Sequence, residues 1–253
     1  MADYDELLNL SAEIGELLLQ NGAEIYRVEE SMERLFTAYG VESQVYCVPT
    51  TIIATIVTPE GENVTKGVRV RSRGTDFDKV MAVNDLCRRA CRETPAFSKI
   101  REELARIRQR RRYSLPVTCL GWALVASSFT LIFGGNFADA ACAFLPAMVV
   151  CLAQYGLNRL EANQFFSLMV ESFLIGVFAI LSVRLGLAQN SDKIIIGTLM
   201  ILVPGLALTN CIRDILAGDL MSGVAKIAEV FLIGVFIALG AAIAVYGAGL
   251  LPV

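Results

Sequence analysis

A run of polar and ionisable side chains interrupts the apolar second half of the chain, at spacings that could serve the movement of a solute or an ion. It occupies residues 202–229 and contains Asn210, Arg213, Asp214, Asp219, Ser222, Lys226 and Glu229. The flanking segments, 194–203 and 230–251, are apolar and typical of membrane helices. An ionisable group at the centre of a bilayer costs about 3 kcal/mol by insertion scales, so it persists only inside a helix bundle or along an aqueous path. The run therefore predicts a transport pathway, and the alternative is a cytoplasmic loop between two ordinary spans.

The spacing of these residues favours a pathway because it gathers them on helix faces. At 100° per residue, one stripe of roughly 120° holds Asp219, Ser222, Lys226 and Glu229. One face of the preceding helix holds Asn210, Arg213 and Asp214. In the upstream span Pro204 removes a backbone donor and Gly205 follows it, so the helix can break where freed carbonyl groups could coordinate a solute.

The residue types argue against an enzyme. The chain contains no histidine, which removes the usual general base and the usual metal ligand. The candidate nucleophiles of the N-terminal region are Ser43, Cys47, Thr50 and Thr51, which only a Lys or Glu base could activate. The seven cysteines form no metal-binding or disulfide pattern, so we interpret them as reduced packing residues. We expect no catalysis, no cofactor and no metal site, with a hydrolase-like N-terminal domain as the alternative.

Charge is distributed unevenly along the 253 residues and predicts two parts. Most of the 22 Lys and Arg and the 25 Asp and Glu residues precede Tyr113, and the rest of the chain is largely apolar. We predict a small cytoplasmic α+β domain over 1–96, a basic juxtamembrane helix over 97–113 and a transmembrane domain over 114–253. The net charge of −3 and the lack of a basic face with interleaved aromatic residues argue against a nucleic-acid partner.

The N-terminal region combines helical and strand patterns. Amphipathic helices precede and follow three strands, which we predict over 43–48, 52–57 and 64–71. The second helix carries charges at spacings of three residues, which form either a solvated face or a docking face: Glu24, Arg27 and Glu30.

The apolar region predicts an α-helical membrane protein with five transmembrane helices, one or two of them broken at proline. The spans lie over 114–133, 137–157, 165–187, 193–214 and 222–250. An arginine-rich segment over 106–112 directly precedes the first span and, by the positive-inside rule, fixes the soluble domain in the cytoplasm. An odd number of spans then leaves the C-terminus outside.

An internal duplication emerges when the chain is aligned with itself at an offset of 58 residues. The segment ESFLIGVF from Glu171 and the segment EVFLIGVF from Glu229 are identical at seven of eight positions. We therefore predict a two-fold repeat relating 136–186 to 194–244, and the alternative is a chance likeness between two membrane helices.

The duplication makes Glu171 and Glu229 counterparts with different surroundings. Lys226 stands one turn before Glu229, whereas no basic residue stands within a turn of Glu171. We expect Glu229 to stay ionised, paired with Lys226 or Arg213, and Glu171 to be the better candidate for protonation during transport. The alternative has both glutamates solvated at the level of the lipid head groups.

Three motifs resemble the threonine/serine exporter family, in its ThrE/YjjP-like branch. They are GAEIYRVEE from Gly22 to Glu30, the Phe-Gly-Gly of 133–135 with Asp139 following, and VPGLALTNCIRDILAGDLMSG over 203–223. The resemblance implies an inner-membrane exporter of threonine and serine, or of a dicarboxylate such as succinate. It also implies a homo- or hetero-oligomer with a second, smaller membrane subunit, because fused members carry a second membrane module that is lacking here. The alternatives are a regulatory or assembly subunit and a membrane-anchored hydrolase-like protein.

Overall fold

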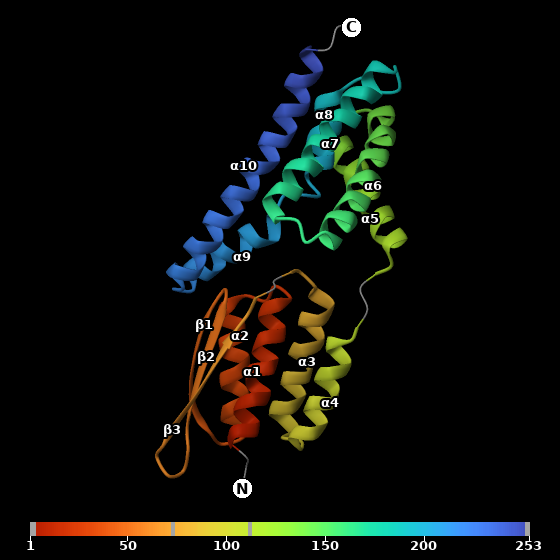
Figure 1. Cartoon of the computed structure of the whole chain (residues 1–253). Helices are drawn as coiled ribbons and strands as arrows, with labels where there is room; N and C mark the ends of the chain where they lie inside the picture. Colours follow the sequence, from red (N-terminus) through yellow and green to blue (C-terminus); the bar gives the residue numbers. More distant parts are fainter. Residues whose placement is uncertain (1–3, 72–73, 111–112, 251–253) are drawn as a thin grey trace. The chain divides into compact units, whose positions relative to one another are not determined.

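The computed structural model describes residues 4–71, 74–110 and 113–250 of the chain. The chain forms two compact units, and Figure 1 shows the order of their helices and strands. The first unit consists of Met1–Arg111 and Leu206–Ile227, and the second of Arg112–Gly205 and Ala228–Val253.

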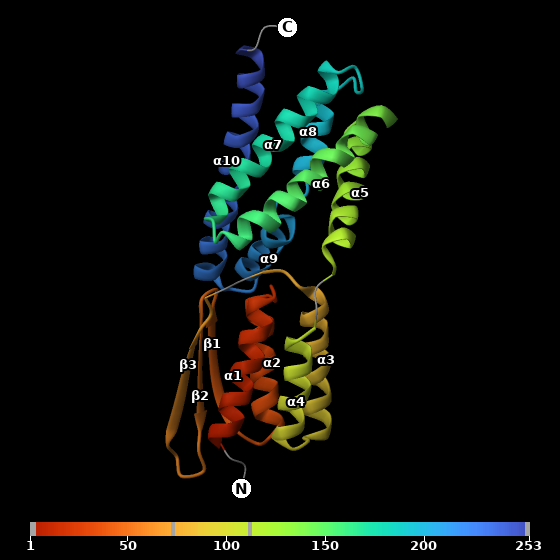
Figure 2. The same cartoon turned by 45° about the vertical axis from the view of Figure 1, so that its right-hand side comes forward.

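The first unit packs a three-stranded antiparallel sheet against one side of a group of helices (Figures 1 and 2). Its N-terminal elements are α1 (Tyr4–Gln20), α2 (Ile25–Ala38), β1 (Glu42–Val48), β2 (Thr51–Val57), β3 (Asn63–Arg69), α3 (Phe77–Glu93) and α4 (Phe97–Arg108). The sheet order is β1-β2-β3, with Val45 opposite Ala54 and Ile52 opposite Val68. These elements confirm the predicted small α+β region.

Alternation along β2 explains how the sheet covers the helices. Ile52 and Ile56 are fully buried, whereas Ile53 between them is exposed on the opposite face. Gly15 of α1 allows the layers to approach, because a side chain there would collide with Met32 of α2 and contact Ile52.

The helix α4 shares this core. Its apolar residues Ile100, Leu104 and Ile107 are buried in the same cluster as the side chains of α1, α2 and β2. The helix predicted at 97–113 therefore packs through residues 97–108 onto the α+β region, and residues 111–112 lie outside the described part of the chain. The domain boundary at residue 96 stays a prediction.

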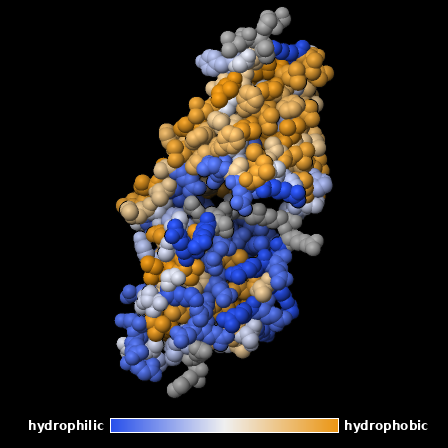
Figure 3. Space-filling view, viewed as in Figure 1, coloured by the Kyte–Doolittle hydropathy of each residue, from blue (hydrophilic) through white to orange (hydrophobic). Residues whose placement is uncertain are grey.

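The second unit is built from apolar helices. They are α5 (Leu115–Ile132), α6 (Phe137–Arg159), α7 (Gln164–Arg184), α8 (Ser191–Leu199) and most of α10 (Leu220–Leu250). Figure 3 shows apolar residues gathered over this unit and hydrophilic residues over much of the first. Among the described residues, four helices are long and apolar enough to cross a membrane: Leu115–Ile132, Phe137–Arg159, Gln164–Arg184 and Leu220–Ala248.

The predicted fourth span, 193–214, corresponds to two shorter helices. α8 ends at Leu199 and α9 (Gly205–Leu216) begins after Pro204, and their 9 and 12 residues are each fewer than the roughly 20 that a straight span needs. Pro146, in contrast, lies inside the continuous helix α6. The helical membrane fold is confirmed, while the count of five crossings and the two-fold repeat stay predictions.

Small residues allow close helix packing in the second unit. A Cβ at Gly240 of α10 would lie 2.1 Å from the Met169 carbonyl oxygen, and one at Gly197 of α8 would lie 2.5 Å from the Thr130 nitrogen of α5. Such contacts are typical of membrane helix bundles, where association depends on van der Waals packing of backbones. They fix α7 against α10 and α5 against α8.

Candidate functional site

The junction of α1 and α2 presents a carboxylate at the start of α2. Gly22 has φ of +90°, and a Cβ there would lie 3.0 Å from the Gly74 carbonyl oxygen, so only glycine fits. The Gly74 N–H donates to the Gln20 carbonyl oxygen at 2.9 Å and fixes the turn. Glu24 follows as the residue before α2, and its side chain makes no capping hydrogen bond. Its carboxylate is therefore available to other groups.

Glu24 joins the N-terminal motif to the central polar run. Its side chain is only 8% exposed and forms ion pairs with Arg27 of α2 and Arg213 of α9. Asn210, one turn before Arg213, donates from Nδ2 to the Gly22 carbonyl oxygen at 3.4 Å. Residues of two motifs that are far apart in the sequence thus meet in one polar network within the first unit.

A second, buried ion pair joins α9 to α10. Lys226 Nζ lies 2.7 Å from Asp214 Oδ2, with Asp214 fully buried and the Lys226 side chain 16% exposed. The turn between the helices contains Gly218 at φ +103°. Gly223 allows α10 to pack closely against α9, because a Cβ there would lie 3.0 Å from the Cys211 carbonyl oxygen. Truncating one partner of such a pair leaves the other charge buried, which is strongly destabilising.

Carboxylates outnumber cations around Lys226. Burial raises the pKa of Glu29, and the charges of Asp219 and Asp214 raise it further, although the N–H of Cys47 donates to Glu29 Oε1 at 2.7 Å and lowers it. Burial also raises the pKa of Asp219, with Asp214 adding to this effect and Lys226 opposing it. These carboxyl groups therefore hold a proton more readily than they would in water.

The candidate nucleophiles lie in and beside the sheet. Ser43 and Cys47 belong to β1, Thr51 begins β2, and Thr50 lies in the turn between the two strands. Burial and the nearby Glu29 raise the pKa of the Cys47 thiol to about 12, so the thiol is protonated at neutral pH. A protonated thiol is a poor nucleophile, which argues against cysteine chemistry here.

Glu171 of α7 is a buried carboxyl group in the second unit. It is 1% exposed, and neither of its oxygens has a hydrogen-bond partner among the described residues. Leu168 and Ile175, about one turn away on either side, belong to an apolar cluster that includes Ile233 and Ile237 of α10. A carboxylate without a partner in apolar surroundings is costly, which marks the residue as a candidate for function.

The remaining predicted residues lie in both units. Ser222 is buried in the first unit, Glu229 is half-buried in the second, and Pro204 and Gly205 lie at the break before α9. Glu30 pairs with Arg34 at 2.6 Å, and its charge also acts on Arg27 of the Glu24 network.

Two ion pairs join residues that sequence spacing did not bring together: Lys226 pairs with Asp214, and Arg213 pairs with Glu24. The first pair forms because α9 and α10 turn back on each other at Gly218, so that Asp214 faces Lys226 across the hairpin. The expected pairing of Glu229 with Lys226 or Arg213 stays a prediction.

Asp139 has a structural role that the sequence reasoning did not assign. It is fully buried and accepts hydrogen bonds from the backbone N–H groups of Gln189 and Asn190 at 2.8 and 3.0 Å. It also completes a capping box with Asn136 at the start of α6. The Asn136-x-x-Asp139 spacing is the signal that could have indicated this anchor of the α7–α8 loop.

Comparison with known proteins matches these features to one family. The family model described as "Putative threonine/serine exporter" matches residues 9–246. The chain is 25% identical over 236 residues to the "Threonine/serine exporter" of Corynebacterium glutamicum, covering 89% of this chain and 48% of the relative. It is 24% identical over 210 residues to the "Probable succinate transporter subunit YjjP" of Klebsiella aerogenes, covering 83% and 81%.

A further relative, the "Probable succinate transporter subunit YjjP" of Escherichia coli, is 22% identical over 218 residues, covering 86% of this chain and 85% of the relative. The chain thus spans about half the length of the Corynebacterium relative and most of the length of the YjjP subunits. No solved structure matches it significantly. Because the family model covers nearly the whole chain, the protein belongs to the threonine/serine exporter (ThrE) family.

Proposed function

We propose that this chain is a subunit of an inner-membrane exporter that moves small carboxylate-bearing metabolites out of the cytoplasm. The observation that carries the proposal is Glu171, a buried carboxyl group on the apolar helix α7. It has no hydrogen-bond partner among the described residues of the chain. Such a group can carry a coupled proton for any of these substrates, and for an amino acid, though not for succinate, it can also meet the amine. The relatives named for threonine and serine export and for succinate transport support this substrate class, since each of these compounds bears a carboxylate.

The side of the membrane on which each helix ends supports five crossings. With the basic segment before α5 in the cytoplasm, α5, α6 and α7 cross in alternating directions and α7 ends outside. The next long span, in α10, begins beside Lys226, which pairs with Asp214 in the unit that holds the cytoplasmic α+β region. The chain must therefore return through the segment that contains α8 and the break at Pro204.

In such a returning segment, the break at residues 200–204 lies within the membrane. Non-helical backbone within a membrane is tolerated only where protein or water satisfies its polar groups. Residues 200–204 carry no regular helix, and Leu202 among them is buried in the cluster that flanks Glu171. We infer that this break and Glu171 border the same solute path, as in transporters with interrupted helices.

The polar network of Glu24, Arg213, Asp214 and Lys226 is the cytoplasmic end of the proposed system. Its ion pairs tie α9 and the start of α10 to the α+β region, so movement of this region can be transmitted to the start of a membrane helix. The relatives named as transporter subunits support a second membrane subunit as partner. A regulatory role for this chain is the second candidate function, favoured by the same network.

Efflux from proteoliposomes tests the proposal. The chain is reconstituted with and without its partner subunit, loaded with labelled threonine or succinate, and compared with Glu171→Gln and with Glu161→Gln, whose side chain is exposed. We expect Glu171→Gln to reduce efflux by an order of magnitude and to flatten its dependence on pH, while Glu161→Gln behaves as wild type. Wild-type efflux and pH dependence in Glu171→Gln would refute a role for this carboxyl group. Efflux by the partner alone would favour the regulatory role.

A further inference from the structure

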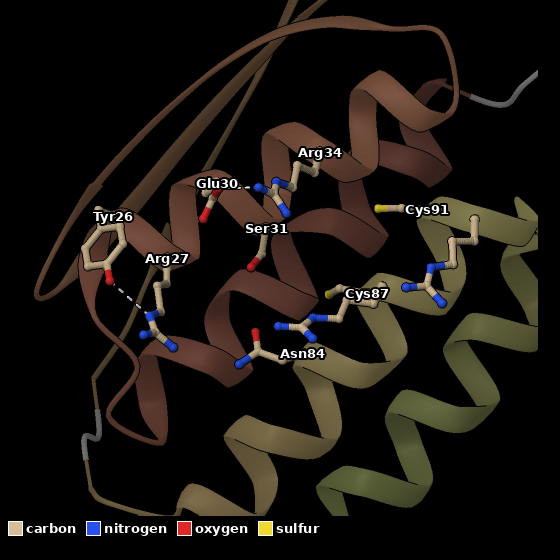
Figure 4. Close-up of a pocket in the computed structure, with 10 residues that line it drawn as sticks. Tyr26, Arg27, Glu30, Ser31, Arg34, Asn84, Cys87 and Cys91 are labelled. Carbon is tan, nitrogen blue, oxygen red and sulfur yellow. Dashed lines mark hydrogen bonds and ion pairs between the residues drawn. The ribbon is translucent and has the colours of Figure 1, made fainter.

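A cavity between α2 and α3 of the first unit is rich in arginine. Its volume is about 650 Å³, and its lining includes Arg27, Arg34, Arg88 and Arg92 with Glu30 as the one acidic residue. Figure 4 shows Ser31 of α2 and Asn84 of α3 on facing walls, with Arg27 and Arg34 on the α2 side. The cavity therefore carries a net charge of +3 from its lining residues.

Two of the four arginines form ion pairs, and the other two form none with the described residues. Arg27 pairs with Glu24, and Arg34 pairs with Glu30. Arg88 and Arg92, in contrast, make no ion pair or hydrogen bond within residues 4–71, 74–110 and 113–250. Polar groups that face a cavity without a partner are ready to bind a ligand, since exchanging water for a charged ligand group costs them little reorganisation.

Neutral donors add to the guanidinium groups. Ser31 and Asn84 are half-buried, and in the described part of the chain neither forms a hydrogen bond with another protein group. The inner lining includes Cys87, whose pKa is raised to about 12 by burial, so this thiol stays neutral and does not repel an anion. The cavity thus combines positive charge, hydrogen-bond donors and an uncharged inner wall.

The volume of the cavity and its hydrogen-bond donors indicate which class of ligand it can bind. A cavity of this size falls in the range of about 300–1,000 Å³ that is typical of drug-sized ligands, more than a four-carbon acid would fill. The planar guanidinium fork matches phosphate and binds it in a bidentate manner. We propose that this cavity is a binding site for an organic phosphate of nucleotide size, held by Arg88 and Arg92 on α3 and oriented by Ser31 and Asn84. The site is separate from the Glu171 pathway and does not depend on the proposed transport function.

Binding of ATP and of inorganic pyrophosphate to the full chain tests this site. The chain is placed in nanodiscs of phosphatidylcholine, without divalent metal, and titrated by calorimetry. We expect both probes to bind and the double variant Arg88→Gln with Arg92→Gln to weaken binding at least about tenfold. Arg89→Gln is the matched control, because Arg89 lies on the same helix but pairs with Glu103. Binding to this control should stay within about twofold of wild type, falling with added salt in both.

Other outcomes overturn the proposal. Absence of ATP and pyrophosphate binding at millimolar concentrations contradicts it, as does equal binding by the double variant and wild type when both melt at the same temperature. Tighter binding of succinate or threonine than of ATP would assign the cavity to transported carboxylates instead. Abolition of ATP binding in nanodiscs of phosphatidylglycerol would assign it to lipid head groups.

Discussion

The buried pair of Lys226 and Asp214 gives the sharpest prediction about stability. Changing Lys226 to Met removes the charge that lies 2.7 Å from Asp214 Oδ2 and leaves a fully buried carboxylate, whose Oδ1 already lacks a partner among the described residues. Breaking a buried pair costs about 3–5 kcal/mol, and the 16% exposure of Lys226 places this case near the lower figure because water reaches one partner. We therefore expect a loss of about 3 kcal/mol.

Hydrogen exchange along α9 and the first turns of α10 measures this loss. A loss of about 3 kcal/mol makes local opening more frequent by a factor of somewhat over 100. The double variant Asp214→Leu with Lys226→Met should recover most of the protection, since replacing both charges by apolar groups removes the unpaired carboxylate. As a control, Arg106→Met breaks an exposed pair with Glu102 and should cost at most about 1 kcal/mol. Exchange in Lys226→Met that matches wild type, with no gain in the double variant, would refute the reasoning.

Two further predictions concern groups outside the pathway. The pKa of Glu29 is raised in the folded state, so its contribution to stability is present below its unfolded pKa and is lost as pH rises through the folded pKa. Glu29→Gln should remove this loss of stability with rising pH. Melting temperatures of wild type and variant between pH 4 and 8 check it, and parallel curves would contradict it. In the second unit, Cys119 Sγ and Cys151 Sγ lie 2.9 Å apart on α5 and α6, so a membrane-permeable oxidant should join them. Mass spectrometry should detect a Cys119–Cys151 disulfide in wild type and in Cys142→Ser but not in Cys151→Ser. A disulfide between Cys119 and Cys142 instead would mean a different packing of α5 and α6.

Much of the fold could be predicted because local patterns determine it. Apolar length predicted the membrane helices, and alternation predicted β1, β2 and β3 within a residue or two of their ends. Pro204 and Gly205 indicated the interruption between α8 and α9, because proline cannot donate the backbone hydrogen bond that continues a helix. The resemblance to the family rested mainly on the central run, which is long and unusual for a membrane segment, and also on the shorter GAEIYRVEE motif.

The pairing of charges between different helices was decided by tertiary structure alone. Spacing along one helix brings Lys226 near Glu229, but the Gly218 turn brings Asp214 to it from another helix. The same holds for Glu24 and Arg213, which are 189 positions apart, and for the arginines that α2 and α3 bring to one cavity. Periodicity specifies which face of a helix is apolar or charged, because this follows from 100° per residue. It does not specify which other helix that face meets, because that depends on close packing over the whole unit.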